Sequence, residues 1–266
     1  LKEKDPAFVA ETLALPSETF LAEQMDVVDP DALHASRNAL RRALASHFKD
    51  LFLEIYRKHE SGIPYSPDAE SSGRRALRNL ALAYLMELET GDVVALCYEQ
   101  FGQSDNMTEQ SAALTALANS SAPQRGIALD SFYGRWKDEP LIVDKWLAVQ
   151  AGARLPGTLA RVQELLIHPA FDLKVPNKVY SLVRAFAANH VRFHSADGAG
   201  YAFLADQVLA LDKLNPQVAA RIARGFDRWK RFDPSRKEKS KTQLERIRDT
   251  AGLSRDVAEI VGKALA

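Results

Sequence analysis

Apolar residues recur at helical spacing along almost the whole chain. One stripe has steps of three, four or seven between its members, which are Leu33, Leu40, Leu44, Phe48, Leu51 and Ile55. Charged residues fall between these positions, so the pattern predicts one amphipathic helix over residues 30–55. Similar stripes cover residues 77–88, 159–166, 179–186, 204–211 and 218–229. Alternation at period two, which is typical of strands, is almost absent.

Helix starts are marked by a polar residue followed by proline. The polar side chain can cap the free N–H groups of a first helical turn, where proline needs no N–H of its own. This pair occurs at Asp5-Pro6, Asp29-Pro30, Ser66-Pro67, Asn215-Pro216 and Asp233-Pro234. With about a dozen or slightly more helices, one helical hairpin takes roughly forty residues, as in stacked two-helix repeats. We therefore predict an all-α protein, an α-solenoid or superhelical stack of helical hairpins in one domain over 1–266, with an irregular bundle as the alternative.

Charge and composition exclude several classes of protein. The 266 residues carry 35 basic and 35 acidic side chains, so no overall charge directs the chain to nucleic acid or to an anionic membrane. No apolar run approaches the length of a membrane span, and the first residues lack the apolar core of a secretion signal. The one cysteine, Cys97, cannot form an internal disulfide and lies in an apolar run, which is typical of a buried hydrophobe. We predict no membrane partner and a cytoplasmic location.

Motifs of self-sufficient catalysis are missing from the sequence. There is no glycine-rich phosphate loop, no Cys-x-x-Cys pair and no serine nucleophile elbow. The closest match to His-Glu-x-x-His begins at His59, but Ile63 stands where the second histidine belongs. His190 and His194 have metal-ligand spacing, although residues 189–198 read as a helix end and a loop. We predict no catalytic residue, no metal and no cofactor in this chain.

Basic residues concentrate near the C-terminus. Residues 221–249 hold eleven basic and five acidic side chains, interleaved with Phe226, Trp229 and Phe232. Clustered cations with aromatics would suit a nucleic-acid ligand. Binding of that kind weakens steeply as the salt concentration rises. The aromatics, however, continue the helical stripe from Val218, so we assign them to the core. The cations then form a solvated face or pair with acids elsewhere, and we predict no nucleic-acid partner.

Short segments spread over the full length carry a further signal. They are Leu15-Pro16-Ser17-Glu18, Leu77-Arg78-Asn79, Asn106-Met107-Thr108, Val143-Asp144-Lys145-Trp146, Asn215-Pro216-Gln217-Val218-Ala219 and Lys263-Ala264-Leu265-Ala266. These segments occur in the same order in the C-terminal helical domain of bacterial aminopeptidase N, and the chain resembles that domain. Aminopeptidase N belongs to the zinc-dependent gluzincin aminopeptidases. The resemblance implies that residues 1–266 are roughly the last third of a longer enzyme. Its zinc and catalytic domain would lie upstream and are absent from this chain.

The same resemblance implies a role and a site. The domain would be an α-solenoid that closes the active-site chamber and admits short or flexible peptides, with the upstream catalytic domain and the peptide substrate as partners. A family segment near the substrate matches residues 215–221, which implies substrate-binding roles for Gln217 and Arg221. One helical turn apart near a positive helix end, they suit carbonyls or a carboxylate, whereas the residues alone also allow pairing with a neighbouring helix. Lys178 and Tyr180 stand at positions where other family members have arginines. Substrate contacts of those arginines therefore cannot be assigned to this chain.

We therefore predict the C-terminal domain of a zinc-dependent aminopeptidase that cleaves N-terminal residues from peptides. The isolated chain is expected to fold, to bind no zinc and to hydrolyse no aminoacyl substrate. The alternative is a free-standing helical-repeat scaffold that binds a protein partner on its concave face.

Overall fold

The chain is helical and divides into two compact units. The computed structural model describes residues 5–60 and 65–266; within these, unit 1 holds 5–17, 35–60 and 65–135, and unit 2 holds 18–34 and 136–266. In these described ranges there is no strand, and Val28 and Phe232 form one isolated parallel bridge within unit 2. The prediction of an all-α, solenoid-like stack is confirmed.

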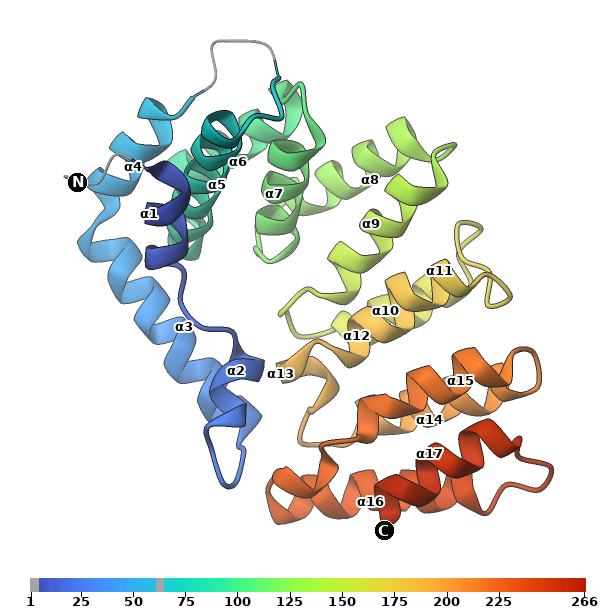
Figure 1. Cartoon of the computed structure of the whole chain (residues 1–266). Helices are drawn as coiled ribbons and strands as arrows, with labels where there is room; N and C mark the ends of the chain where they lie inside the picture. Colours follow the sequence, from blue (N-terminus) through green and yellow to red (C-terminus); the bar gives the residue numbers. More distant parts are fainter. Residues whose placement is uncertain (1–4, 61–64) are drawn as a thin grey trace. The chain divides into compact units, whose positions relative to one another are not determined.

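Unit 1 is a stack of helices around α5 (Figure 1). Its helices are α1 (Pro6–Leu13), most of α3 (Pro30–His47), α4 (Lys49–Lys58), α5 (Ala69–Leu85), α6 (Gly91–Gln103), α7 (Met107–Ala118) and α8 (Gln124–Trp136). Helices α1, α4 and α7 pack on α5, and α6 packs on α7. Cys97 on α6 is fully buried, and burial raises the pKa of its thiol to about 12. The interpretation of Cys97 as a buried hydrophobe is confirmed.

The helix predicted over residues 30–55 is wrong as a single element. The structure breaks it at Phe48, whose backbone angles are φ −110° and ψ 23°, and α4 begins at Lys49. Phe48 N–H still donates to the Leu44 carbonyl at 2.9 Å, and Phe52 N–H donates to the Phe48 carbonyl at 2.9 Å. Because hydrogen bonding continues through the break, the apolar spacing also continues, and periodicity alone does not reveal the kink.

Four of the five polar-proline pairs begin helices, and the exception is Ser66-Pro67. Helix α5 starts at Ala69, and its cap is the Asp68 carboxylate, which accepts from Ser71 N–H at 2.9 Å. Hydrogen bonds from the Ser66 hydroxyl and from Ser71 hold the pKa of Asp68 well below its usual value. The predicted start was therefore wrong by two residues, because an adjacent carboxylate is the capping acceptor and Ser66 supports it.

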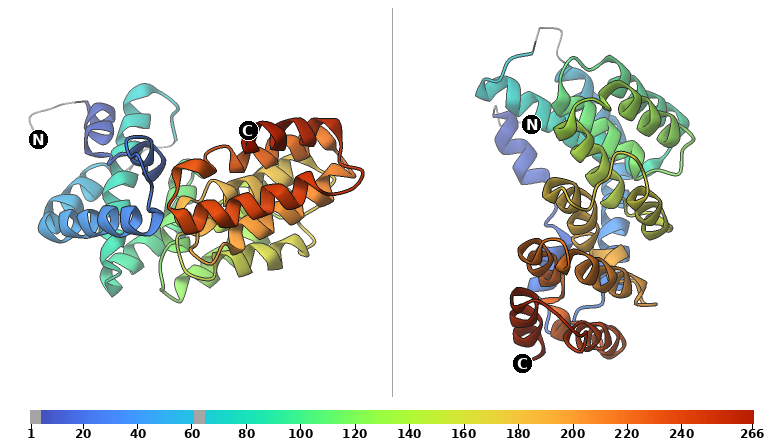
Figure 2. Two further views of the ribbon diagram at one scale, coloured as in Figure 1. Left: turned by 90° about the horizontal axis from the view of Figure 1, so that it is seen from below. Right: turned by 90° about the vertical axis from the view of Figure 1, so that its right-hand side faces the viewer.

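Unit 2 continues the same construction in pairs of helices. Its elements are α2 (Glu18–Glu23), the start of α3, α9 (Pro140–Ala151), α10 (Thr158–Leu166), α11 (Pro176–Val179), α12 (Ala185–Ala187), α13 (His190–Phe193), α14 (Ala199–Asp212), α15 (Pro216–Ala223), α16 (Pro234–Arg248) and α17 (Arg255–Leu265). Helix α10 packs on α9, α15 on α14 and α17 on α16, while α14–α16 and α15–α17 contacts join successive pairs. The yellow-to-red helices of unit 2 run side by side in Figure 2.

The basic C-terminal segment packs its aromatics inward. Phe226, Trp229 and Phe232 are all buried, which confirms their assignment to the core. The helix expected to run from Val218 to Trp229 instead ends at Ala223 and gives way to two short 3-10 turns. None of the helices in residues 5–60 and 65–266 is both long and apolar enough to cross a membrane.

Candidate functional site

A cleft of about 740 Å³ lies within unit 2 and is the candidate site. Its wall comes from α2, from the residues around α12 and α13, and from the end of α15 with the segment that follows it. Five arginines line it, namely Arg184, Arg221, Arg224, Arg228 and Arg231, together with the two carboxylates Glu23 and Asp227. Concave sites lined by a few convergent polar groups are the usual form of ligand sites. The cleft is therefore suited to an anionic or carbonyl-rich ligand.

The structure places the two predicted substrate-binding residues differently. The Asn215 side chain accepts from Val218 N–H at 3.1 Å and begins α15 at Pro216, so Gln217 and Arg221 stand one turn apart on this helix. Both are exposed. Arg221 lines the cleft, whereas Gln217 does not. The helix cap thus sets the start of α15, and this helix carries Arg221 to the cleft.

Tyr180 links Arg221 to a second arginine. Arg221 Nη1 donates to the Tyr180 hydroxyl at 3.2 Å, and the Arg184 guanidinium lies 5.9 Å from the Tyr180 ring centroid. Residues 180–184 form a single π-helical turn between α11 and α12. Such turns inside α-helices are rare and occur frequently at functional sites. Sequence reasoning did not find Arg184; its spacing of four from Tyr180 was the available signal.

Lys178 is held away from the cleft by its own partners. Its Nζ lies 2.8 Å from Asp144 Oδ1 and donates to the Pro140 carbonyl at 3.1 Å, both on α9. Lys178 and Asp144 side chains are each about one-seventh exposed or less. Lys178 therefore joins α11 to α9, and of Lys178 and Tyr180 only Tyr180 contacts a cleft-lining side chain.

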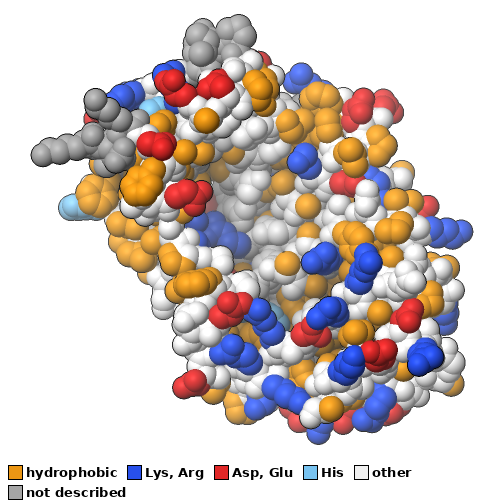
Figure 3. All heavy atoms as spheres, in the orientation of Figure 1, with side chains coloured by type: hydrophobic (Ala, Val, Ile, Leu, Met, Phe, Trp, Pro, Cys, Tyr) orange, Lys and Arg blue, Asp and Glu red, His pale blue; other side chains and the backbone are white. Residues whose placement is uncertain are grey.

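The charges of the cleft are only partly balanced. Arg228 pairs with Glu23 at 2.6 Å, and Arg224 pairs with Asp227 at 3.0 Å. Arg231 donates to the backbone carbonyls of Glu23 and Met25, which leave its charge uncompensated. In Figure 3, basic side chains lie among acidic ones over the part of the view where α14 to α17 are drawn in Figure 1.

Two histidines form the back of the cleft. His190 Nδ1 lies 3.9 Å from Glu18 Oε2, and His194 Nδ1 lies 2.9 Å from the Tyr201 hydroxyl. Burial lowers the pKa of His190, and burial together with His190 and Arg236 lowers the pKa of His194 well below its usual value. Both are therefore neutral near pH 7 and add no positive charge.

The histidine pair does not belong to a metal centre in the part of the chain that the structure describes. Within residues 5–60 and 65–266, no group of three or more His, Cys, Asp or Glu side chains is placed to hold a metal ion. His194 instead stacks on Phe232 with ring centroids 3.9 Å apart, and its carbonyl accepts from the buried Arg236 at 2.6 Å. Arg236 also pairs with Asp31 and Asp233, so basic residues of this segment do pair with acids elsewhere, as predicted.

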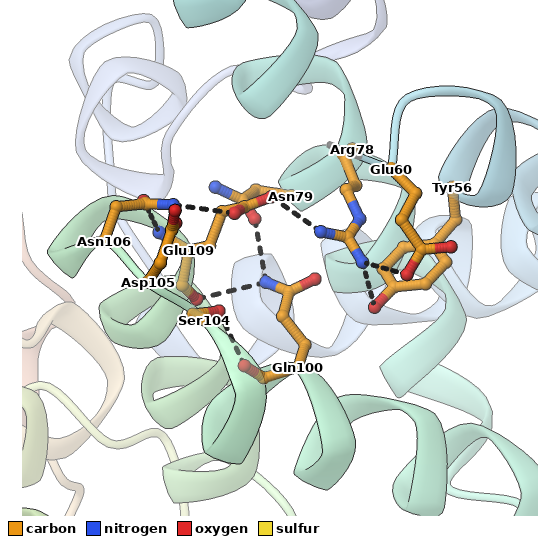
Figure 4. Close-up of polar contacts among 9 residues, drawn as sticks. All are labelled: Tyr56, Glu60, Arg78, Asn79, Gln100, Ser104, Asp105, Asn106 and Glu109. Atoms are coloured by element: carbon orange, nitrogen blue, oxygen red, sulfur yellow. Dashed lines mark hydrogen bonds and ion pairs between the residues drawn. The ribbon is translucent and has the colours of Figure 1, made fainter. Parts of the chain in front are cut away.

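A second polar cluster lies within unit 1 (Figure 4). Arg78 Nη1 donates to Glu109 Oε1 at 2.7 Å, and Arg78 Nη2 donates to the Tyr56 hydroxyl at 3.1 Å and to Glu60 at 3.2 Å. The Asn106 side-chain oxygen accepts from Glu109 N–H and caps the start of α7, and its amide nitrogen donates to Glu109 Oε2. The Arg78 and Glu109 side chains are only 8% and 4% exposed. This cluster joins α4, α5 and α7, and we assign it a structural role.

The stack of paired helices with an arginine-lined cleft defines a helical-repeat domain. The chain belongs to the family described as "Domain of unknown function (DUF3458_C) ARM repeats", whose model matches residues 1–266. It is 41% identical over 262 residues to aminopeptidase N of Caulobacter vibrioides and 38% identical over 268 residues to aminopeptidase N of Escherichia coli. These alignments cover 98% and 100% of this chain, but only 30% and 31% of the relatives.

A solved structure extends the likeness to three dimensions. Legionella pneumophila aminopeptidase A, crystallised in complex with aspartic acid, matches with a TM-score of 0.91 and 32% identity. The match covers 100% of this chain and 32% of that chain. The chain thus spans about a third of the length of its relatives, and its resemblance to the C-terminal domain of aminopeptidase N is confirmed.

Proposed function

We propose that this chain works as the C-terminal domain of a zinc-dependent aminopeptidase, where it closes the active-site chamber and admits short or flexible peptides. The observation that carries the proposal is similarity over the full chain to proteins named aminopeptidase N that are about three times as long. Zinc and the groups that activate the attacking water belong, in this proposal, to the longer protein. We place that enzyme in the cytoplasm.

The cleft of unit 2 supports a role in the chamber wall. The Arg221 guanidinium donates one hydrogen bond to the Tyr180 hydroxyl, so its remaining N–H groups can donate to peptide carbonyls or to a carboxylate. Gln217 lies one turn earlier on α15 and is exposed. We propose that Gln217 extends the same polar surface beyond the cleft and offers both an amide donor and an acceptor to a peptide backbone.

An apolar surface on unit 1 supports a permanent neighbour. The side chains of Leu40, Phe48 and Leu51, on α3, at the kink and on α4, are 48%, 41% and 41% exposed. Full burial of such a side chain stabilises by about 1.5–3 kcal/mol, so covering the exposed half of one adds about 1 kcal/mol, and covering all three favours a lasting contact. We propose that the catalytic region of the longer enzyme covers this surface.

Kinetics of the full-length enzyme test the chamber-wall role. Arg221→Ala should lower kcat/KM for a tri-alanine peptide by about fivefold or more, equivalent to roughly 1 kcal/mol of lost transition-state binding. The double variant Arg224→Ala with Asp227→Ala is the matched control, because it removes a cleft arginine together with its paired carboxylate and leaves the net charge of the cleft unchanged. Unchanged kinetics with a lowered melting temperature would instead assign Arg221 a purely structural role.

A second assay tests whether the chemistry lies outside this chain. The 266-residue chain, supplied with zinc, should release no p-nitroaniline from alanine p-nitroanilide. The full-length enzyme is the positive control. Zinc-dependent turnover by the chain alone would refute the proposal that catalysis is carried by another region.

A further inference from the structure

The π-helical turn on the cleft wall places two polar side chains toward one point. Residues 176–187 form one helical segment in which α11 and α12 flank the turn Tyr180–Arg184. The turn begins with the phenol and ends with the guanidinium, and Arg184 lines the cleft. Because π turns are rare and occur frequently at functional sites, this turn is a signal independent of the charge pattern.

One phenol positions two guanidinium groups from separate elements. Arg221 donates to the Tyr180 hydroxyl from α15, and Arg184 lies near the face of the same ring from its own helix. Tyr180 is partly buried, whereas Arg184 and Arg221 are exposed. The aromatic ring is therefore the fixed part of the group, and the N–H donors of both arginines face solvent in the cleft.

These two arginines differ in charge balance from Arg224 and Arg228 of the same cleft. Arg224 and Arg228 each pair with a carboxylate, whereas among the described residues neither Arg184 nor Arg221 has a carboxylate within ion-pair distance. Ile222 and Phe232 contribute apolar wall beside them. Less water at such a wall strengthens the attraction between an anion and the guanidinium groups.

We propose that Arg184, Tyr180 and Arg221 form a receptor for a carboxylate of the bound peptide. This inference rests on the proposed function, which supplies peptides as ligands. A guanidinium can donate two parallel N–H groups to one carboxylate, and the Tyr180 hydroxyl can donate its proton while it accepts from Arg221. The carboxylate comes either from the peptide C-terminus or from an acidic side chain, and both sources present the same two oxygens.

Binding of small peptides to the 266-residue chain tests the receptor. Affinities at low salt, from NMR titration, are compared for tri-alanine with a free C-terminus, for its amide, and for Ala-Glu-Ala amide, whose one carboxylate is in the side chain. We expect the free acid to bind at least about fivefold more tightly than tri-alanine amide, a typical effect of one exposed charge-assisted contact. If Ala-Glu-Ala amide binds as tightly as the free acid, the receptor also accepts the carboxylate of an acidic side chain. If it binds no better than tri-alanine amide, the receptor takes only the C-terminal carboxylate of the peptide.

Variants of cleft residues locate the effect. Arg184→Ala and Arg221→Ala should each remove most of the preference for the free acid, and Tyr180→Phe should reduce it while keeping the ring beneath Arg184. The double variant Arg224→Ala with Asp227→Ala removes a guanidinium from the same cleft together with its paired carboxylate, so the net charge is unchanged and the preference should persist. Circular dichroism checks that each variant is folded. Equal affinity for acid and amide, or an equal loss in the double variant and in Arg184→Ala, would overturn the receptor.

The two proposals fail in different ways. Peptide binding to this chain requires neither zinc nor the catalytic region. A carboxylate preference in the chain, combined with unaltered kinetics of Arg221→Ala in the full-length enzyme, would refute the chamber-wall role and leave the receptor. Altered kinetics without a carboxylate preference would refute the receptor and leave the chamber-wall role.

Discussion

Removing Arg78 should destabilise unit 1 more than removing its buried partner. In Arg78→Met, Glu109 keeps only the Asn106 side-chain amide, which donates to Oε2 at 2.8 Å, and Oε1 loses its cation. The Glu109 side chain is only 4% exposed, so its carboxylate would remain largely buried without a cation. Breaking one side of a buried ion pair typically costs 3–5 kcal/mol, and we expect about that loss in the free energy of unfolding.

Glu109→Gln should be milder because Arg78 retains other partners. The guanidinium still donates to Glu60 at 3.2 Å and to the Tyr56 hydroxyl at 3.1 Å, and it lies 4.5 Å from the Tyr56 ring centroid. Glu60 is largely exposed, so its compensation is partial, and we expect a loss of about 2 kcal/mol. The double variant Arg78→Met with Glu109→Leu should recover most of the stability, since no charge remains buried.

Urea denaturation followed by circular dichroism measures these free energies, and hydrogen exchange assigns them to unit 1. Exchange is needed because all three tryptophans, Trp136, Trp146 and Trp229, belong to unit 2, so their fluorescence does not report the cluster directly. Amides of α5 and α7 should lose protection in Arg78→Met. A larger loss in Glu109→Gln than in Arg78→Met would show that Glu60 and Tyr56 do not compensate the guanidinium.

Three further predictions follow from burial. Cys97 should resist iodoacetamide at pH 8 in the folded chain and react after unfolding, because its pKa is raised to about 12 and its thiol is inaccessible. Mass spectrometry detects the alkylation, and an alkylated Cys97 in the folded chain would contradict this prediction. Because the folded pKa of His194 is depressed, its stabilising contribution is present above pH 6.5 and declines below it, by up to about 1.4 kcal/mol per pH unit, and His194→Gln should flatten this slope in urea titrations. Gly200→Ala should cost more than about 3 kcal/mol, because its Cβ would lie 2.2 Å from the Phe193 carbonyl oxygen, whereas Gly134→Ala in open space on α8 should gain about 0.5–1 kcal/mol in thermal melts.

Local signals explain why most of the fold was predictable from the sequence. Apolar spacing identifies a helix because burial on one face repeats along its axis, and polar-proline pairs mark starts because caps act within one turn. Two of the errors, at Phe48 and at Ser66-Pro67, have local causes as well. The backbone at Phe48 turns without losing its hydrogen bonds, and Asp68 outcompetes Ser66 as a cap by its charge. Neither changes the apolar pattern, so neither is visible in it.

The cleft was less predictable because its polar groups meet across long sequence separations. Arg221 lies 41 residues from the phenol that it contacts, and the spacing of α15 alone carries no information on that partner. The π turn leaves no clear periodic signal, because one widened turn shifts the phase only slightly. From the sequence, a phenol at position 180, where other family members have an arginine, predicts only that a substrate contact is lost. Its contacts show a different consequence: Tyr180 is uncharged itself, yet it holds Arg184 and Arg221 beside one another, so the positive charge of this wall depends on residues four and forty-one positions further along the chain.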